Sequence, residues 1–380
     1  MAPLLTRNLL LGQSPSLQPS PSSNRDEPPL IRHPQFSSLS PPSFRRAIAV
    51  VVIVVFIGTL IIFRDLSAST LYKGLDPPNH RKAAQLSAKD LLESPVPKNY
   101  EFVPKLIHQS WSTPELPSKF ETWSRSCREQ NPDWQWVLWT DEDNLNLVKK
   151  YFPWYLEYYQ KLPGEIYRAD LVRNMYMHLY GGMYADLDVE CLRPANELFE
   201  TYNIAAVPYK STYDGSHHRS LNVLQERKAF FGRMGTNDTF DHSIPNAWMA
   251  STPGHPLKGA IPGKITAEQL TGPIALRRYI NLYLSKYRNS DELVVDVIGP
   301  QNAMKHTVEV LPWWNVFPYS WDRDGLAFRE ICSVNSKKYD RERCKSNIAA
   351  DRWGSYFITY WSHSWSRSGH NDDNMKNIAN

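Results

Sequence analysis

The chain has 380 residues, of which 42% are hydrophobic and 12% aromatic, enough to form at least one sizeable hydrophobic core. Its 43 basic and 39 acidic residues give a formal net charge of +4. Because this balance is close to even and no basic stripe is interleaved with aromatic residues, the sequence argues against a nucleic-acid partner.

Residues 1–46 predict a disordered tail. They contain nine Pro and nine Ser but only two acidic residues and no Lys, a composition that cannot form a packed core. The Pro clusters are also compatible with polyproline ligands for an adaptor protein. A solvated tail on the cytosolic side is the favoured interpretation.

Residues 47–63 predict a transmembrane helix. The run AIAVVVIVVFIGTLIIF has no charged residue and is bracketed by Arg45-Arg46 and Arg64. Its length of 17 residues is at the lower limit for a helix that spans a bilayer. Its distance from the N-terminus disfavours a cleaved signal peptide. The excess of Arg before the span predicts a single-pass type II protein of the Golgi or endoplasmic reticulum membrane, with its catalytic domain in the lumen.

Residues 64–100 predict a stem, because two Pro-containing clusters interrupt any regular pattern there. A lumenal domain is then expected over residues 101–380. Four cysteines without CxxC spacing do not suggest zinc. In an oxidising lumen Cys332 and Cys344 are the favoured disulfide, with buried free thiols as the alternative. Asn237 begins a glycosylation sequon.

Strands and helices alternate through the first part of this domain. Residues 103–108, 134–139 and 204–207 predict strands, and residues 117–128 predict a helix. Thr140-Asp141 can cap the next helix. A longer helix is expected over residues 165–180, ending at Gly181-Gly182, with one buried stripe formed by Ala169, Val172, Met175, Tyr176 and Leu179. The alternation predicts an α/β sandwich around a mostly parallel sheet.

Asp186 and Asp188 are the main candidates for chemistry. The run 183–189 alternates like a strand, so both carboxylates are expected to leave the same face. Ligands of such sheets bind at the carboxyl ends of strands, and two oxygen donors there suit Mg²⁺ or Mn²⁺ clamping a diphosphate. Without its context, a solvated turn would be the better interpretation of Asp-x-Asp.

The helix before this run carries Arg168, Asp170 and Arg173. Asp170 and Arg173 are spaced as an i, i+3 pair on one face. One interpretation is an exposed ion pair. The other is that Asp170 accepts hydrogen bonds from sugar hydroxyls while Arg173 lies beside the phosphates or the sugar.

Several motifs then occur in a characteristic order. They are PKLIHQSW at 104–111, NPDW at 131–134, LWTD at 138–141, RADLVR at 168–173 and GGMYADLD at 181–188. Together they resemble glycosyltransferase family 32, which includes fungal α-1,6-mannosyltransferases and inositol phosphorylceramide mannosyltransferases. The ordered match covers residues 102–200. It implies a GT-A fold, retaining transfer from a nucleotide sugar, and a divalent metal held by the Asp-x-Asp motif.

The resemblance also implies roles for individual residues. Asp188 would be the principal metal ligand, Asp186 would contact the ribose and the metal, and Asp170 and Arg173 would contact the donor sugar. Trp111 resembles the tryptophan that stacks on the nucleotide base; the alternative is a core aromatic residue. Further candidates for donor binding are Arg168, Tyr184, Asn246, Ser364 and Trp365.

His363 lies in a C-terminal segment that resembles one closing over the diphosphate. It is a candidate third metal ligand, with a packed histidine as the alternative. The segments around Asn246 and around Thr271-Gly272-Pro273 also resemble family segments. One departure is Asn174, where the family commonly has Tyr after the arginine.

The function that the resemblance implies is mannose transfer from GDP-mannose. Inositol phosphorylceramide is the preferred acceptor, because YFPWYL at 151–156 resembles that subgroup, and a protein N-glycan is the close alternative. UDP-galactose or UDP-N-acetylglucosamine donors would use the same motifs. Two alternatives of other classes are a catalytically silent partner in a membrane transferase complex and an adaptor acting through the Pro-rich tail.

Overall fold

The computed structural model describes residues 82–98, 101–214, 226–255, 266–287 and 305–362. The predicted tail, the predicted transmembrane helix and most of the predicted stem lie outside these ranges. So do His363, Ser364 and Trp365. Within the described ranges, none of the helices combines the length and the apolar composition that crossing a bilayer requires.

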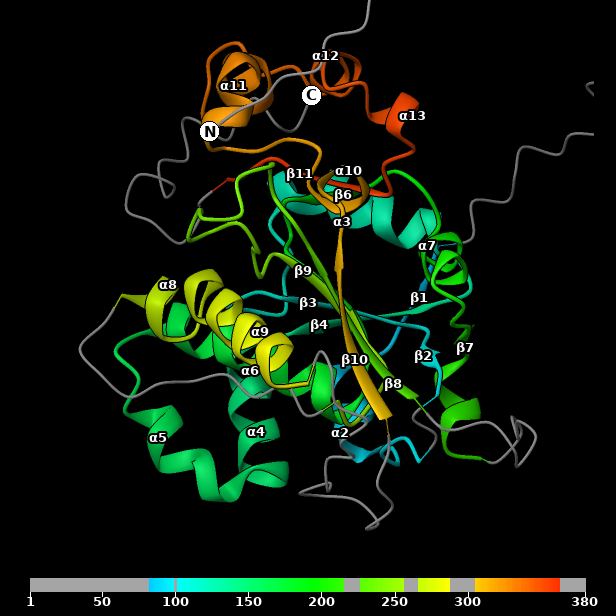
Figure 1. Cartoon of the computed structure of the whole chain (residues 1–380). Coiled ribbons are helices and arrows are strands. Elements are labelled where there is room, and N and C mark those ends of the chain that lie inside the picture. Colours follow the sequence, from blue (N-terminus) through cyan, green and yellow to red (C-terminus); the bar gives the residue numbers. More distant parts are fainter. Residues whose placement is uncertain (1–81, 99–100, 215–225, 256–265, 288–304, 363–380) are drawn as a thin grey trace, which may run out of the picture. The chain divides into compact units, whose positions relative to one another are not determined.

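The described residues form a central seven-stranded sheet (Figure 1). In spatial order its strands are β1 (Ala84–Gln85), β4 (Gln135–Trp139), β3 (Leu106–Ser110), β5 (Gly182–Ala185), β9 (Trp248–Ser251), β8 (Glu226–Gly232) and β10 (Lys305–Leu311). β9 runs antiparallel to both of its neighbours, and every other neighbouring pair in this sheet is parallel. The predicted mixed α/β fold with a mostly parallel sheet is confirmed.

Two smaller sheets flank the central one. β6 (Val189–Cys191) pairs antiparallel with β11 (Phe357–Thr359), and β2 (Val103–Pro104) pairs parallel with β7 (Ala206–Val207). The pairing of β6 with β11 brings the end of the described chain next to the Asp186–Asp188 segment.

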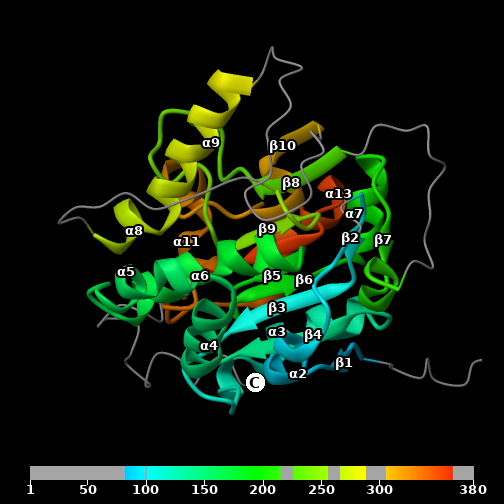
Figure 2. The ribbon, with the colours of Figure 1, turned by 90° about the horizontal axis from the view of Figure 1, so that it is seen from below.

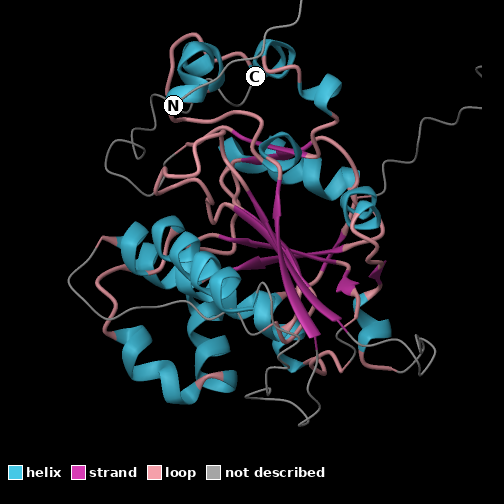
Figure 3. Ribbon diagram, viewed as in Figure 1, coloured by secondary structure: helices cyan, strands magenta, loops and turns pink. Residues whose placement is uncertain are grey.

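Helices lie on both faces of the central sheet (Figure 3). The α-helices are α2 (Ala88–Glu93), α3 (Ser118–Gln130), α4 (Asp141–Tyr151), α5 (Leu156–Gln160), α6 (Glu165–Leu179), α7 (Ala195–Thr201), α8 (Ala267–Leu270), α9 (Pro273–Tyr287), α10 (Trp313–Val316), α11 (Arg329–Cys332), α12 (Arg341–Asn347) and α13 (Ala350–Trp353). Three short 3₁₀ helices among the described residues are η1 (Pro153–Tyr155), η2 (Tyr209–Thr212) and η3 (Arg323–Phe328).

Alternation along the strands divides the core into two hydrophobic clusters. On β4, Trp136 and Leu138 join the cluster that contains α3 and α7, whereas Val137 and Trp139 join the cluster that contains α2, α4, α6 and α9. This division follows from the two-residue period of a strand, which sends successive side chains to opposite faces. The sheet is therefore buried on both sides, as parallel sheets usually are.

Helix α6 is buried more completely than the sequence predicted. Of the predicted positions, Val172, Met175, Tyr176 and Leu179 are buried, whereas Ala169 is only partly buried. The buried residues of α6 also include Leu171, Met177, Asp170 and Arg173. The single buried stripe is therefore a wrong prediction, because α6 packs against β5, β9, α4 and α8 at once. Figure 2 shows α8 next to α6. Burial on this side places Asp170 and Arg173 inside the molecule instead of on an exposed face.

Gly181 and Gly182 end α6 and start β5, as predicted. Their φ angles are +68° and +93°, a region that favours glycine. A Cβ on Gly182 would lie 2.7 Å from the Leu106 carbonyl oxygen. His108 supports this turn: its Nδ1 accepts from Trp139 Nε1 at 3.0 Å, so its Nε2 is the donor to the Gly181 carbonyl oxygen at 3.0 Å. Burial lowers the pKa of His108 to about 4.

Two disulfide bonds connect elements around this core. Cys332 and Cys344 are bonded, which confirms the favoured pairing, and Cys127 is bonded to Cys191. The second bond was not predicted, and the free-thiol alternative is wrong. It joins α3 to β6 across 64 residues of sequence.

Candidate active site

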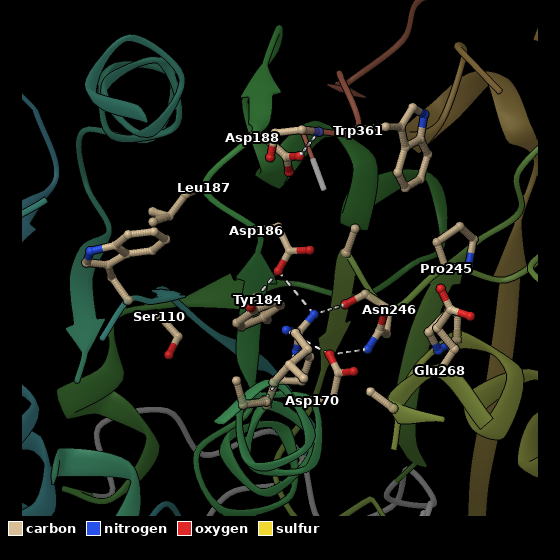
Figure 4. Close-up of a pocket in the computed structure, with 18 of the residues that line it drawn as sticks. Ser110, Asp170, Tyr184, Asp186, Leu187, Asp188, Pro245, Asn246, Glu268 and Trp361 are labelled. Carbon is tan, nitrogen blue, oxygen red and sulfur yellow. Dashed lines mark hydrogen bonds and ion pairs between the residues drawn. The ribbon is translucent and has the colours of Figure 1, made fainter. Parts of the chain in front are cut away.

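A pocket of about 520 Å³ lies at the carboxyl ends of β3 and β5. This is the edge at which parallel sheets bind ligands. The loop before β9, the N-terminal half of α6, helix α8 and the segment after β11 complete its walls (Figure 4). Many of the predicted site residues line it, namely Trp111, Asp170, Arg173, Tyr184, Asp186, Asp188 and Asn246.

Asp186 and Asp188 lie in a turn, and the prediction that a strand carries them is wrong. β5 ends at Ala185, and Val189 N donates to the Asp186 carbonyl oxygen at 3.1 Å, which closes the turn. Asp186 N still donates to the Ala247 carbonyl oxygen at 2.8 Å. The chain therefore changes partner, from β9 on one side of the turn to β11 on the other.

Arg173 lies at the centre of the polar groups in this pocket. Its guanidinium contacts Asp170 Oδ1 at 3.0 Å through Nη2 and Asp186 Oδ1 at 3.1 Å through Nη1. Nη1 also donates to the Asn246 carbonyl oxygen at 2.9 Å, and the guanidinium carbon lies 4.5 Å from the centre of the Tyr184 ring. Since Arg173 is only 5% exposed, these contacts fix one side-chain conformation (Figure 4).

Asp170 is held from three sides. Asn246 Nδ2 donates to Asp170 Oδ1 at 2.8 Å, the oxygen that Arg173 also contacts. Behind it, a Cβ added to Gly272 would lie 3.0 Å from Asp170 Oδ2. The segment Thr271-Gly272-Pro273 can pack this closely against the Asp170 carboxylate because Gly272 has no side chain. Asn174, the departure from the family pattern, donates to the Asp170 backbone carbonyl at 2.9 Å.

Burial shifts the pKa of each of the three carboxyl groups upward. It raises the pKa of Asp170 to about 6 and that of Asp186 to about 6, although Arg173 lowers both. Burial also raises the pKa of Asp188, against hydrogen bonds from Ser362. For Arg173, burial lowers the pKa but Asp186, Tyr184 and Asp170 raise it above its usual value. One cation among three carboxylates leaves excess negative charge in this pocket.

The donor set fits a divalent cation of the Mg²⁺ or Mn²⁺ type. Asp186 Oδ1 accepts from the Tyr184 hydroxyl at 2.6 Å and contacts Arg173, and in Figure 4 its other oxygen points away from these contacts. Asp188 Oδ2 accepts from Ser362 N at 2.7 Å. Each aspartate is thus oriented through one oxygen. Hard cations of this kind use one or two carboxylates and take further ligands from water and phosphate.

The described residues hold no group of three or more His, Cys, Asp or Glu placed to bind a metal. A cation at Asp186 and Asp188 would therefore need ligands from elsewhere. His363, the predicted third ligand, lies outside the described residues, as do the donor-binding candidates Ser364 and Trp365, and their roles stay predictions.

Trp111 and Arg168 occupy different environments. Trp111 is half-buried at the pocket wall, and its ring meets the edge of Phe120 with centroids 5.3 Å apart. Arg168 does not line the pocket. Its guanidinium instead donates to carbonyl oxygens at the end of α5, those of Tyr159 and Gln160, and in the turn after it, that of Leu162. The structure therefore gives Arg168 a place in holding that turn. It pairs with Glu165 of the pocket wall but does not itself line the pocket.

Other residues in the pocket wall were not singled out from the sequence. They are Ser110, Ser112, Asp141, Glu165, His242, Glu268, Trp321, Trp361 and Ser362, among others. Asp141 was interpreted as part of a helix start and of the LWTD motif, without a role in the site. It is the first residue of α4, which begins with a capping box formed by Thr140 and Asp143. Burial, together with the charge of Glu165, raises the pKa of Asp141 to about 6. From the sequence alone, a residue at a helix start that also faces a pocket cannot be distinguished from one that only starts a helix.

Residues 117–205 match the family model described as "Glycosyltransferase sugar-binding region containing DXD motif". The matched segment contains α6, with Asp170 and Arg173, and the turn with Asp186 and Asp188. Arg173 and the three aspartates therefore lie in the segment that matches this family model, whereas Asn246 lies outside it.

Curated relatives match over similar segments. Inositol phosphoceramide mannosyltransferase 3 of Schizosaccharomyces pombe is 44% identical over 25% of this chain and 27% of its own length. Inositol phosphoceramide mannosyltransferase 1 of the same organism is 30% identical over 45% of this chain and 46% of its own. Mannosyl phosphorylinositol ceramide synthase SUR1 of Saccharomyces cerevisiae is 34% identical over 28% of each chain. The chain spans less than half the length of each, and these matches confirm the resemblance that the motifs indicated.

Proposed function

We propose that this chain, whose residues 117–205 carry a glycosyltransferase sugar-binding region with a DXD motif, is a retaining, metal-dependent mannosyltransferase. The observation that carries the proposal is the arrangement around Arg173. It joins Asp170 and Asp186 in the wall of a 520 Å³ pocket that Asp188 also lines. That volume suits a ligand of nucleotide-sugar size.

In this proposal the chain's own residues bind and orient the donor. Arg173 fixes the carboxylates of Asp170 and Asp186, so little reorganisation is needed when the donor binds. Asp170 accepts hydrogen bonds from sugar hydroxyls, and Trp111 stacks on the nucleotide base. A divalent cation at Asp186 and Asp188 would offset the charge that develops on the departing diphosphate.

Retention of configuration is proposed from the resemblance to family 32. In such a reaction an oxygen of the leaving phosphate assists attack from the same face of the sugar, and the protein contributes by positioning the reactants. Since Asp186 and Asp188 are both present and both line the pocket, a catalytically silent partner is not favoured.

The donor and acceptor in this proposal are GDP-mannose and inositol phosphorylceramide. Three relatives named for mannosyl transfer to, or synthesis of, such glycolipids support this choice, as does the subgroup-like segment at 151–156. A protein N-glycan acceptor and UDP-hexose donors are the alternatives. We further propose that residues 47–63 anchor the protein in the Golgi or endoplasmic reticulum membrane, with the pocket in the lumen.

A donor panel tests the proposal. The full-length protein in detergent, with Mn²⁺ and inositol phosphorylceramide, is supplied separately with GDP-mannose, UDP-galactose, UDP-glucose and UDP-N-acetylglucosamine. We expect glycolipid product and nucleotide release with GDP-mannose, and only background with Asp188→Ala. Faster turnover of a UDP-sugar would reject the donor assignment, and turnover of GDP-mannose without glycolipid product would reject the acceptor.

A further inference from the structure

The sequence Asp186-Leu187-Asp188-Val189-Glu190 places a third acidic residue at the same spacing as the first two. Its side chain nevertheless has other partners. Glu190 lies in β6, opposite Ile358 of β11, and is only 6% exposed. It does not line the pocket. From its spacing alone Glu190 would be predicted as a cation ligand, but the fold places its side chain outside the pocket wall.

Both carboxylate oxygens of Glu190 are engaged. The Tyr360 hydroxyl donates to Oε2 at 2.6 Å, and Lys345 Nζ donates to Oε1 at 3.0 Å. Lys345 comes from α12 and also pairs with Glu342 at 2.9 Å. A buried carboxylate needs both a counter-charge and hydrogen bonds, and these two residues supply them to Glu190.

Residues Tyr360–Ser362, which we term the strap, continue β11 past the Asp188 side chain. Tyr360 N donates to the Asp188 carbonyl oxygen at 3.3 Å, and Ser362 N donates to Asp188 Oδ2 at 2.7 Å. Between them Trp361 has a φ of +52°, a left-handed conformation that is uncommon for residues other than glycine. Its indole Nε1 donates to the Tyr319 carbonyl oxygen at 3.1 Å. This bend brings the Ser362 N–H onto the carboxylate.

Tyr360 anchors the start of the strap. Its ring stacks on Trp123 at a centroid distance of 5.4 Å and meets the edge of Tyr339 at 5.5 Å. Burial and the neighbouring Glu190 raise the pKa of Tyr360 well above its usual value, so its hydroxyl remains a donor. The same residue thus contacts Asp188 through its backbone and Glu190 through its side chain.

We propose that Glu190 and Tyr360 are positioning residues, which hold the strap so that Ser362 N–H fixes Asp188 Oδ2 and leaves Oδ1 to a divalent cation. This inference rests on the proposed function, because it takes Asp188 as a cation ligand. Lys345 offsets the charge of Glu190, whose buried carboxylate serves the strap and not the cation. Groups that orient metal ligands typically change metal affinity or activity about 10- to 100-fold when they are removed.

Direct Mn²⁺ binding tests the inference without an activity assay. The full-length protein is titrated with Mn²⁺ in the presence of GDP, and free Mn²⁺ is followed by electron paramagnetic resonance. We expect Tyr360→Phe, which keeps the ring packing, and Glu190→Gln, which keeps the shape, each to weaken Mn²⁺ binding about 10-fold. Tyr339→Phe is the matched control, because its hydroxyl is not one of the two donors to Glu190. Thermal unfolding verifies that each variant is folded.

Each outcome decides a different point. Wild-type Mn²⁺ affinity in the folded Tyr360→Phe and Glu190→Gln variants would overturn the inference and leave the proposed function standing. Weakening by Glu190→Gln but not by Tyr360→Phe would also overturn it, since Glu190 would then act on the cation without the strap. A wild-type protein that binds no Mn²⁺ in the presence of GDP would contradict the proposed function and this inference together.

Discussion

Arg173 contacts groups from three separate segments of the sequence, namely two carboxylates and one backbone carbonyl. Asp170 precedes it by one helical turn, Asp186 follows β5, and Asn246 precedes β9. The i, i+3 spacing of Asp170 and Arg173 could be read from the sequence, but it is the spacing of any exposed helical ion pair. Only the burial of α6 distinguishes a pair inside a site from an exposed ion pair. This burial depends on β9 and α8, which lie far along the chain.

At the residue scale, we expect Arg173→Lys to lower kcat/KM for mannose transfer about 100-fold. A lysine has one ammonium group and cannot contact Asp170, Asp186 and the Asn246 carbonyl in the fork geometry of a guanidinium. Arg168→Lys, on the same helix but outside the pocket wall, should change kcat/KM less than about 3-fold. Steady-state kinetics on both variants measure the difference. Equal losses in the two variants would mean that Arg173 acts only through the stability of α6.

At the scale of elements, the sequence predicted most strands and helices between residues 103 and 207 in their order, but it misplaced Asp186 and Asp188 and predicted no elements after residue 207. In the run 183–189 apolar residues occupy every second position, which is the pattern of one continuous strand. In the structure Ala185 and Val189 belong to different sheets. The exchange of partner is set by Ala247 and Thr359, and no local pattern reports hydrogen bonds to segments so distant in sequence.

His108 gives a test of the turn that starts β5. Its pKa is lowered from 6.5 to about 4 by burial. Below pH 6.5 the unfolded chain therefore binds a proton that the folded chain does not, and the free energy of unfolding falls as the pH falls from about 6.5 to 4. The limit of this effect is about 3 kcal/mol. Above pH 6.5 His108 contributes no pH dependence.

We expect the His108→Gln variant to lack the loss of stability that protonation of His108 causes between pH 6.5 and pH 4. Chemical unfolding of both proteins between pH 7 and pH 4 should show that the stability difference between wild type and variant narrows toward acid pH. Comparing the two proteins cancels groups common to both, including Asp170 and Asp186, whose raised pKa values act in the opposite direction. Parallel stability curves would show that His108 is protonated equally in the folded and unfolded chains.

At the scale of the whole molecule, the two disulfides illustrate what one sequence can predict. Cys332 and Cys344 are 12 residues apart in one polar stretch, and their pairing was anticipated. Cys127 and Cys191 are 64 residues apart and become neighbours only because α3 packs on β6. The membrane anchor and the closing role of His363 remain predictions for residues outside the described ranges. The stem prediction is wrong for residues 84–93, which form β1 of the central sheet and the core helix α2.

The proposed function joins these scales at one place, the turn between β5 and β6. Helix α6 supplies Arg173, which contacts this turn, and the turn itself supplies Asp186 and Asp188. The end of the described chain supplies the strap that fixes Asp188. Because the proposed roles of Asp186, Asp188 and the strap all require a bound cation, metal dependence is the property on which the account depends most.

The most direct test measures mannose transfer by the full-length protein from GDP-mannose to inositol phosphorylceramide, before and after verified removal of divalent metal. We predict that turnover falls to background in excess chelator and returns when Mn²⁺ is added back. Folded Asp188→Asn protein should need at least about 10-fold more Mn²⁺ for half-maximal rate. Full turnover by the metal-free protein, or an unchanged Mn²⁺ requirement in Asp188→Asn, would contradict the assignment of this turn as the cation site.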